Sequence, residues 1–446
     1  MAFFTFKQWS NRMRNNIVHI GAGELTYEIR AIVTIAEKLN RLGIKTNMEN
    51  IGDPIAKGEK IPLWMKEIVA DLAMQDCSYG YCATKGLLET RQFLADRTNS
   101  RGYAQICVED IIFFNGLGDA IQKVYGLLKR EARVIGPSPT YSTHSSAEGA
   151  HAGLKPVTYR LDPDNHWYPN MDDLRQSIKY NPSISGVLII NPDNPTGAVY
   201  PELILREIIA LCKEYDLFLI CDEIYHNLCY NGMTTRPISD LIGDLPAIAM
   251  KGISKELPWP GSRCGWIEVY NTDKDETFRR YVESIINSKM VEVCSTTLPQ
   301  KAIPKILAHP EYENYLAERR DRYESYSNIA YNLLKEVPGL KVNRTNGAFY
   351  MSVVFEKNRL TNTQSLPIAN PEVKALVESL VAQPDTQTDK RFVYYLLAAT
   401  GICVVPISSF CTDERGFRIT LLERNEKEFT QIFRTIAETI MVYLKS

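Results

Sequence analysis

The sequence predicts an α/β protein with a large lobe, in which helices flank a mostly parallel sheet, and a smaller α+β lobe. The middle of the chain alternates short apolar runs with amphipathic stretches, a pattern typical of strand–helix–strand units. The length of 446 residues is enough for two or three domains with large buried cores. Beyond about Tyr312 a long charged segment and shorter elements indicate a second lobe.

The elements of the large lobe are predicted in chain order from apolar runs and helical spacing. The predicted strands are Ile111–Phe114, Arg133–Ile135, Gly186–Ile190, Leu217–Cys221 and Ala247–Met250, and the predicted helices are Asp119–Arg130 and Glu202–Tyr215. A further helical pattern runs from Thr26 to Leu42. Because sheets of this kind bind ligands beyond the carboxyl ends of their strands, the loops that follow the strands are the candidate site.

The elements of the small lobe are predicted from the remaining segments. The charged stretch Tyr315–Glu324 predicts a helix that crosses between the lobes and whose charges form an exposed face. Gly347–Phe355 predicts a strand, residues 357–390 an insertion around a helix near 371–381, and Glu426–Tyr443 a C-terminal helix. We therefore expect a large lobe over residues 55–310 and a small lobe that combines 1–54 with 311–446.

Composition excludes several classes of function. Lys plus Arg is 51 and Asp plus Glu is 53, so the net charge of −2 predicts no nucleic-acid partner. No apolar run reaches the ~18 residues that span a membrane, and the first residues do not resemble a signal peptide, so we expect a cytoplasmic protein. The ten cysteines include no Cys-x-x-Cys pair and the histidines no HExxH, so we expect neither a metal site nor a disulfide scaffold.

Two polar clusters directly follow predicted strands. Asn191–Gly197 contains two Asn-Pro pairs, which favour a rigid turn, and a buried Asn amide offers a ligand both a donor and an acceptor. Asp222–Tyr225 places a carboxylate at the mouth of the sheet, where burial requires a cationic partner such as a protonated heterocyclic nitrogen. Each cluster alone is equally compatible with a structural loop.

Two further clusters contain a lysine and a glycine-rich turn. Lys255 follows a short strand in a Gly- and Pro-rich loop, where desolvation would lower its pKa and expose its lone pair. Arg263 in the same loop offers a planar fork to a phosphate. Asn115–Ala120 joins a strand to a helix N-terminus, which suits an anion, although it is neither a Walker A nor a GxGxxG motif. Alone, a loop lysine is usually a surface residue.

Taken together, the four clusters resemble in order and spacing the class I and II aminotransferases, the fold-type I pyridoxal 5'-phosphate enzymes. The intervals are 28 residues from Asn194 to Asp222, 33 to Lys255 and 8 more to Arg263. The resemblance extends from Asn50–Pro54 to Gly416–Thr420. It implies pyridoxal phosphate as cofactor, amino acids and 2-oxo acids as small-molecule partners, and a homodimer.

The resemblance implies roles around the cofactor ring. Lys255 would form the Schiff base and carry the proton between the substrate α-carbon and the cofactor. Asp222 would pair with the pyridinium nitrogen. Tyr225 would donate to the phenolic oxygen with Asn194 beside it, and Tyr141 would stack on the ring.

The resemblance also implies which residues bind the phosphate and the substrate. The amides of Leu117 and Gly118, the Arg263 side chain and Tyr81 from the other subunit would hold the phosphate. Arg418 would form a bidentate pair with the substrate α-carboxylate, assisted by Asn194. The family often has a hydroxyl residue three positions before the lysine, where this chain has Gly252; whether Ser254 compensates stays open.

The substrate is predicted from weaker local resemblance. Tyr394–Phe410 resembles alanine aminotransferases, although Pro406 is not followed by their glycine, whereas the loop Pro260–Trp266 looks more like the aspartate and aromatic group. We expect 2-oxoglutarate as acceptor and alanine ahead of aspartate as donor. An acidic donor would need a second cation, for which the candidates are Arg30, Lys85 and Lys289.

The sequence leaves two alternative functions open. The same cofactor activates any bond at the substrate α-carbon, so a β-lyase or an amino-acid decarboxylase is the first. The second is a regulator that uses this fold as a ligand sensor behind a DNA-binding domain. Only about 50 residues precede Asn50, and their single helical pattern does not predict a helix-turn-helix.

Overall fold

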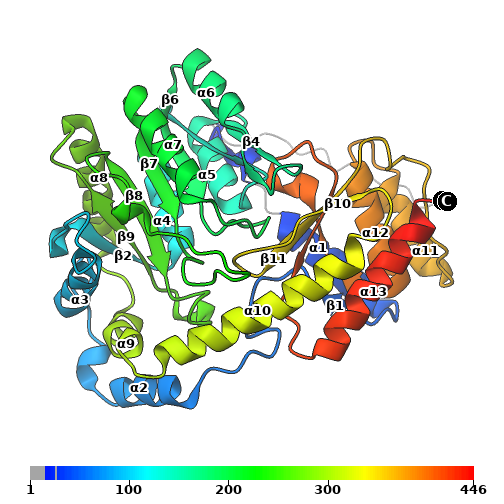
Figure 1. The fold of residues 1–446 in the computed structure, drawn as a ribbon, viewed down its shortest axis with the longest axis horizontal. Coiled ribbons are helices and arrows are strands. Elements are labelled where there is room, and N and C mark those ends of the chain that lie inside the picture. Colours follow the sequence, from blue (N-terminus) through cyan, green and yellow to red (C-terminus); the bar gives the residue numbers. More distant parts are fainter. Residues whose placement is uncertain (1–15, 26–27) are drawn as a thin grey trace.

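The large lobe is built on an eight-stranded mixed sheet, which is mostly parallel as predicted (Figure 1). The computed structural model describes residues 16–25 and 28–446. The strand order is β2-β9-β8-β7-β6-β3-β4-β5, and pairing is parallel from β8 to β4, whereas β9 and β5 run antiparallel to their neighbours. The strands are β2 (Ile111–Phe114), β3 (Arg133–Ser138), β4 (Thr158–Asp162), β5 (Tyr168–Pro169), β6 (Ile184–Ile190), β7 (Phe218–Asp222), β8 (Ala247–Gly252) and β9 (Gly265–Tyr270).

Helices cover both faces of this sheet because its strands are apolar on both sides. In β2, Ile112 and Phe114 pack with helices α4, α5 and α8, whereas Ile111 and Phe113 belong to the larger core that includes α3, α6 and α7. These helices are α3 (Leu88–Asn99), α4 (Leu117–Gly126), α5 (Ser142–Ala152), α6 (Met171–Tyr180), α7 (Glu202–Glu214) and α8 (Glu276–Glu292).

The small lobe contains a four-stranded antiparallel sheet with the order β10-β11-β14-β13. The strands are β10 (Leu340–Val342), β11 (Tyr350–Phe355), β13 (Val405–Pro406) and β14 (Gly416–Thr420), and the helices are α11 (Pro371–Val381), α12 (Thr388–Thr400) and α13 (Glu426–Tyr443). Helix α10 (Tyr312–Leu334) runs from the large lobe to the small lobe (Figure 1).

Segments from the early and late parts of the described chain meet in the small lobe. Strand β1 (Asn47–Met48), which follows α1 (Glu28–Arg41), pairs in parallel with β12 (Ile402–Cys403). The predicted boundaries at residues 54 and 310 stay a prediction. The remaining elements are α2 (Leu63–Ala73), α9 (Thr297–Leu307) and the 3₁₀ helices η1 (Ala22–Glu24), η2 (Asp76–Ser78), η3 (Val108–Asp110), η4 (Ile238–Asp240), η5 (Pro260–Ser262) and η6 (Ile407–Phe410).

Two predicted elements differ from the structure in ways that matter for the site. Helix α4 begins at Leu117 rather than Asp119, because Gly116 adopts a positive φ of 84° and turns the chain directly into the helix. The charges of α10 do not all form an exposed face, since Arg319 is only 1% exposed. Its guanidinium is buried because Nη1 donates to the carbonyl of Lys255 at 2.8 Å and to that of Glu256.

Neither a membrane-crossing helix nor a metal-binding cluster occurs among the described residues. Over residues 16–25 and 28–446, none of the helices combines the length and the apolar character that a membrane crossing requires. In the same part of the chain, no group of three or more His, Cys, Asp and Glu side chains is placed to hold a metal ion.

Candidate active site

A cavity of about 620 Å³ lies beyond the carboxyl ends of the central parallel strands. Residues of both lobes line it, because Arg418 and Tyr350 come from the small-lobe sheet. It contains every predicted site residue except Tyr81: Leu117, Gly118, Tyr141, Asn194, Asp222, Tyr225, Lys255, Arg263 and Arg418. Side chains that lie far apart in the sequence therefore meet at one place, as the strand-end argument requires.

Lys255 lies in the loop after β8 and directs its amine into the cavity. Its Nζ donates to the carbonyl of Gly52 at 2.7 Å and lies 5.7 Å from the ring centroid of Phe349. The backbone of the loop is held from behind by Arg319, which donates to the Lys255 carbonyl. The amine is thus presented on a fixed backbone beside an aromatic ring, in an environment suited to a nucleophilic lysine.

Asp222, the last residue of β7, is a buried carboxylate held at both oxygens. Oδ1 accepts from the amide of Ile224 at 3.1 Å, and Oδ2 lies 3.1 Å from Nε2 of His144 on α5. The other ring nitrogen of His144 lies 3.4 Å from the Tyr125 hydroxyl, so Tyr125, His144 and Asp222 form a buried chain. The Asp222 carboxylate is therefore oriented before any ligand arrives.

His144 is a site residue that sequence reasoning missed, because a lone histidine predicts packing or capping. The available signal is its spacing from Tyr141. The two residues are separated by one helical turn at the start of α5, and their rings meet edge to face at 6.3 Å.

Tyr225 presents a hydroxyl that stays protonated. Its Oη donates to the Tyr350 hydroxyl at 3.2 Å, and its ring meets those of Phe349 and Tyr350 edge to face. Burial, and then the neighbouring Tyr350, raise the pKa of Tyr225 well above its ordinary value. The side chain is therefore a hydrogen-bond donor at every physiological pH.

The turn from Asn115 to Gly118, together with Arg263, forms an anion-binding arrangement that we call the phosphate cradle. The amides of Leu117 and Gly118 belong to the first turn of α4 and have no partner within the helix. A Cβ at Gly116 would lie 2.6 Å from the Arg263 guanidinium, so only glycine permits this approach. Two backbone donors and one guanidinium thus line the same part of the cavity.

The position that lacks the expected hydroxyl lies outside the cavity. Gly252 is the last residue of β8 and borders a separate cavity of about 280 Å³, whereas Ser254 lines the site itself. A Cβ at Gly252 would approach Ile224 Cδ1 at 3.0 Å and the Cys264 carbonyl at 3.2 Å. Close packing therefore disfavours a side chain at this position, and Ser254 is the hydroxyl that reaches the cavity.

Arg418 brings a buried guanidinium from β14 to the large lobe. It is 2% exposed, its Nη1 donates to Asn194 Oδ1 at 3.4 Å, and its Nη2 donates to the Asn50 carbonyl. The guanidinium lies 4.5 Å from the ring centroid of Tyr350. An arginine fixed in this way can accept a carboxylate in a bidentate pair.

Several predicted residues lie outside this cavity. Tyr81 is 88% exposed, so its role from another subunit stays a prediction. Of the candidate second cations, Lys85 pairs with Glu109 at 2.8 Å and Lys289 is buried against Glu292 at 2.7 Å, so neither reaches the cavity of its own chain. The side chain of Arg30 lies outside the described residues.

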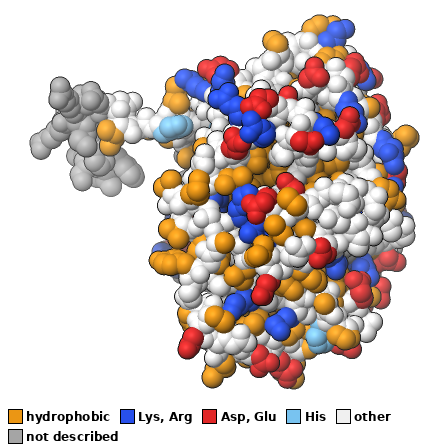
Figure 2. All heavy atoms as spheres, turned by 90° about the vertical axis from the view of Figure 1, so that its left-hand side faces the viewer, with side chains coloured by type: hydrophobic (Ala, Val, Ile, Leu, Met, Phe, Trp, Pro, Cys, Tyr) orange, Lys and Arg blue, Asp and Glu red, His pale blue; other side chains and the backbone are white. Residues whose placement is uncertain are grey.

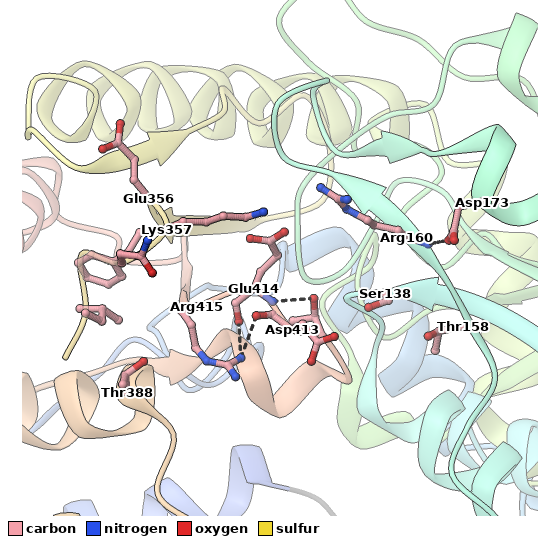
Figure 3. Close-up of a pocket in the computed structure, with 14 residues that line it drawn as sticks. Ser138, Thr158, Arg160, Asp173, Glu356, Lys357, Thr388, Asp413, Glu414 and Arg415 are labelled. Carbon is pink, nitrogen blue, oxygen red and sulfur yellow. Dashed lines mark hydrogen bonds between the residues drawn. The ribbon is translucent and has the colours of Figure 1, made fainter. Parts of the chain in front are cut away.

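A third hollow, of about 470 Å³, lies between β4 and the small lobe (Figure 3). Figure 3 shows Arg160 and Lys357 reaching toward one another across it, with Glu414 between them. Its charged side chains are half-buried or exposed, and it contains none of the predicted site residues. Chemistry that needs desolvated groups therefore belongs to the larger cavity.

The donor set of the larger cavity defines what fits it. A ligand must carry a phosphate for the cradle, a cationic ring nitrogen for Asp222, an acceptor oxygen for Tyr225 and a carbonyl that reacts with Lys255. A phosphorylated pyridine aldehyde has all four groups. The chemistry of the residues therefore fits the cofactor that the resemblance implies.

Comparisons with known proteins identify close relatives. The family described as aminotransferase class I and II matches residues 50–436. An uncharacterized aminotransferase of Methanocaldococcus jannaschii is 61% identical over 434 residues, which cover 97% of this chain and 100% of the relative. A glutamate-pyruvate aminotransferase of Escherichia coli is 32% identical over 328 residues, which cover 73% of this chain and 79% of the relative. The solved structure of an alanine aminotransferase from Pyrococcus furiosus has a TM-score of 0.80 at 28% identity and covers 94% of this chain and 98% of its own.

Proposed function

The chain belongs to the class I and II aminotransferases, and we propose that this transaminase moves an amino group from L-alanine to 2-oxoglutarate with pyridoxal 5'-phosphate as its cofactor. The observation that carries the proposal is the single cavity that joins Lys255, Asp222, Arg418 and the phosphate cradle. The proposal is supported by two relatives, the glutamate-pyruvate aminotransferase of Escherichia coli and the alanine aminotransferase of Pyrococcus furiosus.

The residues of the cavity would hold the cofactor at four points. The phosphate cradle would bind the phosphate, Asp222 would hold the proton on the ring nitrogen, and Tyr225 would turn its hydroxyl proton from Tyr350 to the phenolic oxygen. Tyr141, which lines the same cavity, would stack on the ring. When bound, pyridoxal phosphate supplies an electron sink for negative charge at the substrate α-carbon. His144 keeps the Asp222 carboxylate in place throughout.

Lys255 and Arg418 would act on the substrate. Arg418 and Asn194 bind the α-carboxylate from opposite lobes, so substrate binding draws the lobes together and excludes water. That orientation would place the α-hydrogen next to Lys255. The Lys255 amine would then carry the proton between the substrate α-carbon and the cofactor.

The charges that line the cavity favour a small neutral donor. Among its described lining residues, the cations are Lys255, Arg263 and Arg418, and each has a role in the reaction proposed above. Glu37 on α1 and Asp53 also line the cavity, so a side-chain carboxylate would meet like charge. Alanine, which has no side-chain charge, avoids this repulsion, and aspartate is the second choice.

A homodimer is part of the proposal. Exposed apolar side chains occur in the segment after α2 and at the C-terminal end of α8, at Tyr79, Tyr81, Met290, Val291 and Val293. Figure 2 shows hydrophobic side chains across the face that lies at the left of Figure 1, where α3 and α8 are found. A second copy on this side would bury such a surface and bring Tyr81 to the neighbouring phosphate cradle.

The proposal is tested by absorbance of purified protein reconstituted with pyridoxal phosphate. We expect a visible band that is lost on addition of L-alanine, more slowly with L-aspartate, and that 2-oxoglutarate restores. L-Glutamate and L-tyrosine complete the donor series. Release of ammonia or carbon dioxide in place of a reversible amino transfer would instead establish a β-lyase or a decarboxylase.

A further inference from the structure

Four charged side chains form a cluster behind the phosphate cradle, outside the cavity. We call Asp119 and Lys123 of α4 and Lys289 and Glu292 of α8 the α4–α8 charge cluster. Lys123 pairs with Asp119 and, at 2.6 Å, with Glu292, while Glu292 also pairs with Lys289 at 2.7 Å. None of the four lines the active-site cavity. The cluster has two positive and two negative charges and joins the start of one helix to the end of another.

Glu292 is the counter-charge of the buried Lys289 ammonium. The side chain of Lys289 is 0% exposed, and its Nζ also donates to Ser295 Oγ at 3.0 Å and lies 5.1 Å from the ring centroid of Phe114. A buried ammonium without a counter-charge is strongly unfavourable. Glu292 supplies that charge, so its carboxylate is fixed in one place.

Asn115 transmits this fixed position to the cradle. Its Nδ2 donates to Glu292 Oε1 at 2.8 Å, and its Oδ1 accepts from the Thr296 amide at 3.1 Å. Its own amide donates to Asp119 Oδ2 at 3.1 Å. The residue that precedes Gly116 is thus held by the cluster at both its side chain and its backbone, and its carbonyl accepts from Arg263 at 3.5 Å.

The cluster also balances charge beside the cradle. Asp119 lies in the first turn of α4, where its negative charge alone would repel a bound phosphate. Lys123 neutralises it. Burial works to lower the pKa of Lys123, but the hydrogen bonds that Lys123 donates to Asp119 and Glu292 outweigh burial and raise that pKa. Lys123 therefore stays charged, and Glu292 keeps it beside Asp119.

We propose that Glu292 is a positioning residue for the cofactor phosphate, which fixes the Asn115–Gly118 turn and Arg263 through Asn115 without touching the phosphate. This inference rests on the proposed function, since the phosphate is that of pyridoxal phosphate. It predicts that loss of Glu292 weakens only the part of cofactor binding that the phosphate group contributes. The ring contacts would come from Asp222, the last residue of β7, and from Tyr225 in the turn that follows, and neither residue bonds to the cluster.

The test compares equilibrium binding of pyridoxal phosphate and of pyridoxal, which lacks the phosphate, to the cofactor-free protein. Loss of a charge-assisted bond of this kind is expected to weaken binding of pyridoxal phosphate by Glu292→Ala about tenfold, with pyridoxal binding unchanged. Glu292→Gln keeps an acceptor for Asn115 but loses the charge, so its effect should have the same selectivity and be smaller. Glu283→Gln on the same helix is the matched control, because Glu283 pairs with exposed Arg279 at 2.5 Å. This variant should change the binding of neither ligand.

The outcomes separate this inference from the proposed function. Failure of the wild-type protein to bind pyridoxal phosphate would refute the proposed function. Equal weakening of both ligands in Glu292→Ala, or no weakening at all, would overturn the positioning role while leaving the function intact. If circular dichroism shows that Glu292→Ala is unfolded, the same binding comparison is made with Glu292→Gln. A ratio of pyridoxal phosphate affinity to pyridoxal affinity equal to that of the wild type then refutes the positioning role.

Discussion

At the scale of single residues, the site depends on side chains that hold other side chains. His144 holds Asp222, and Tyr350 holds Tyr225 from the opposite lobe. The sequence does not predict these supports, because a lone histidine or tyrosine in an apolar environment is usually a packing residue. Lys255 and Asp222 could be placed from sequence, since polar residues after apolar strands gather at one edge of a parallel sheet.

Lys255→Ala tests the proposed role of the lysine. Without the amine there is no group to move the α-proton, so transamination of alanine should fall by at least about a thousandfold, the upper part of the range for a general base. Pyridoxal phosphate should still bind without a covalent bond, as dialysis followed by absorbance would reveal. Lys251→Ala is not a suitable control because Lys251 pairs with buried Glu268; exposed Lys274→Ala serves, and full activity in Lys255→Ala would refute the site.

Arg418→Ala tests the carboxylate clamp. Loss of a bidentate, charge-assisted pair should raise the KM for alanine by about 10- to 100-fold, with a smaller effect on kcat. Arg418→Lys should restore little, because an ammonium cannot form the fork. Steady-state kinetics checks both variants, with Arg415→Ala, which borders the other hollow, as the control. An unchanged KM would place the clamp elsewhere.

Asp193, beside Asn194, predicts how stability depends on pH. Burial raises the pKa of Asp193 to about 7, while hydrogen bonds from Thr196 act in the opposite direction. The unfolded chain loses this proton near pH ~3.9, so between about pH 4 and pH 7 the folded state holds more protons and stability falls as the pH rises. Asp193→Asn removes this cost and should be more stable than wild type at pH 8 by up to about 4 kcal/mol, but equal at pH 4.

Urea unfolding at pH 4, 6 and 8 measures this difference. The amide that Asp193→Asn introduces would keep an oxygen for the backbone N–H of Thr196, which now donates to Asp193 Oδ2 at 3.1 Å. The exposed variant Asp385→Asn should follow the wild type at every pH. Parallel pH profiles for Asp193→Asn and the wild type would mean that the buried carboxyl does not titrate in this interval.

At the scale of secondary-structure elements, prediction succeeds where one signal dominates. Helix α13 has the predicted bounds because apolar residues recur at helical spacing and Asn425 caps the start. Helix α5 is not predicted, since its sequence STHSSAEGAHA is small and polar with little periodicity, although most of it is buried. Strand β9 is not predicted either, because it follows the Lys255 loop and is buried on both faces. Packing, rather than local pattern, determines both elements.

Replacing Arg319 of helix α10 is expected to lower the stability of the protein. Arg319→Met removes the donors to the carbonyls of Lys255 and Glu256 and should lower the free energy of unfolding by about 2–4 kcal/mol, because buried acceptors lose their partner. Thermal and urea unfolding measure it. Glu318→Met, one residue earlier on the exposed side of the helix, should change stability by less than about 0.5 kcal/mol. Equal effects would show that Arg319 acts only through helix propensity.

At the scale of the whole molecule, the two lobes share one site and the exposed apolar side predicts a second copy. Val291 is 89% exposed at the end of α8. Val291→Glu should weaken self-association by at least about tenfold and reduce pyridoxal phosphate affinity with it, because Tyr81 of the second copy would be lost. Analytical ultracentrifugation over a range of concentrations checks this. Leu203→Glu, 76% exposed on α7, is the control and should leave association unchanged.

The pairing of β1 with β12 has a consequence for biosynthesis. Asn47 lies opposite Ile402. Strand β1 can therefore pair only after the ribosome has added a further 355 residues, the separation between positions 47 and 402. At a ribosomal rate of ~5–20 residues per second, the time between the synthesis of β1 and that of β12 is roughly 20–70 s. The strands of the large lobe, β2 to β9, have all been synthesised by Tyr270, so that sheet can assemble while translation continues. The segment that contains β1 therefore completes its native strand pairing only after most of the chain has been synthesised.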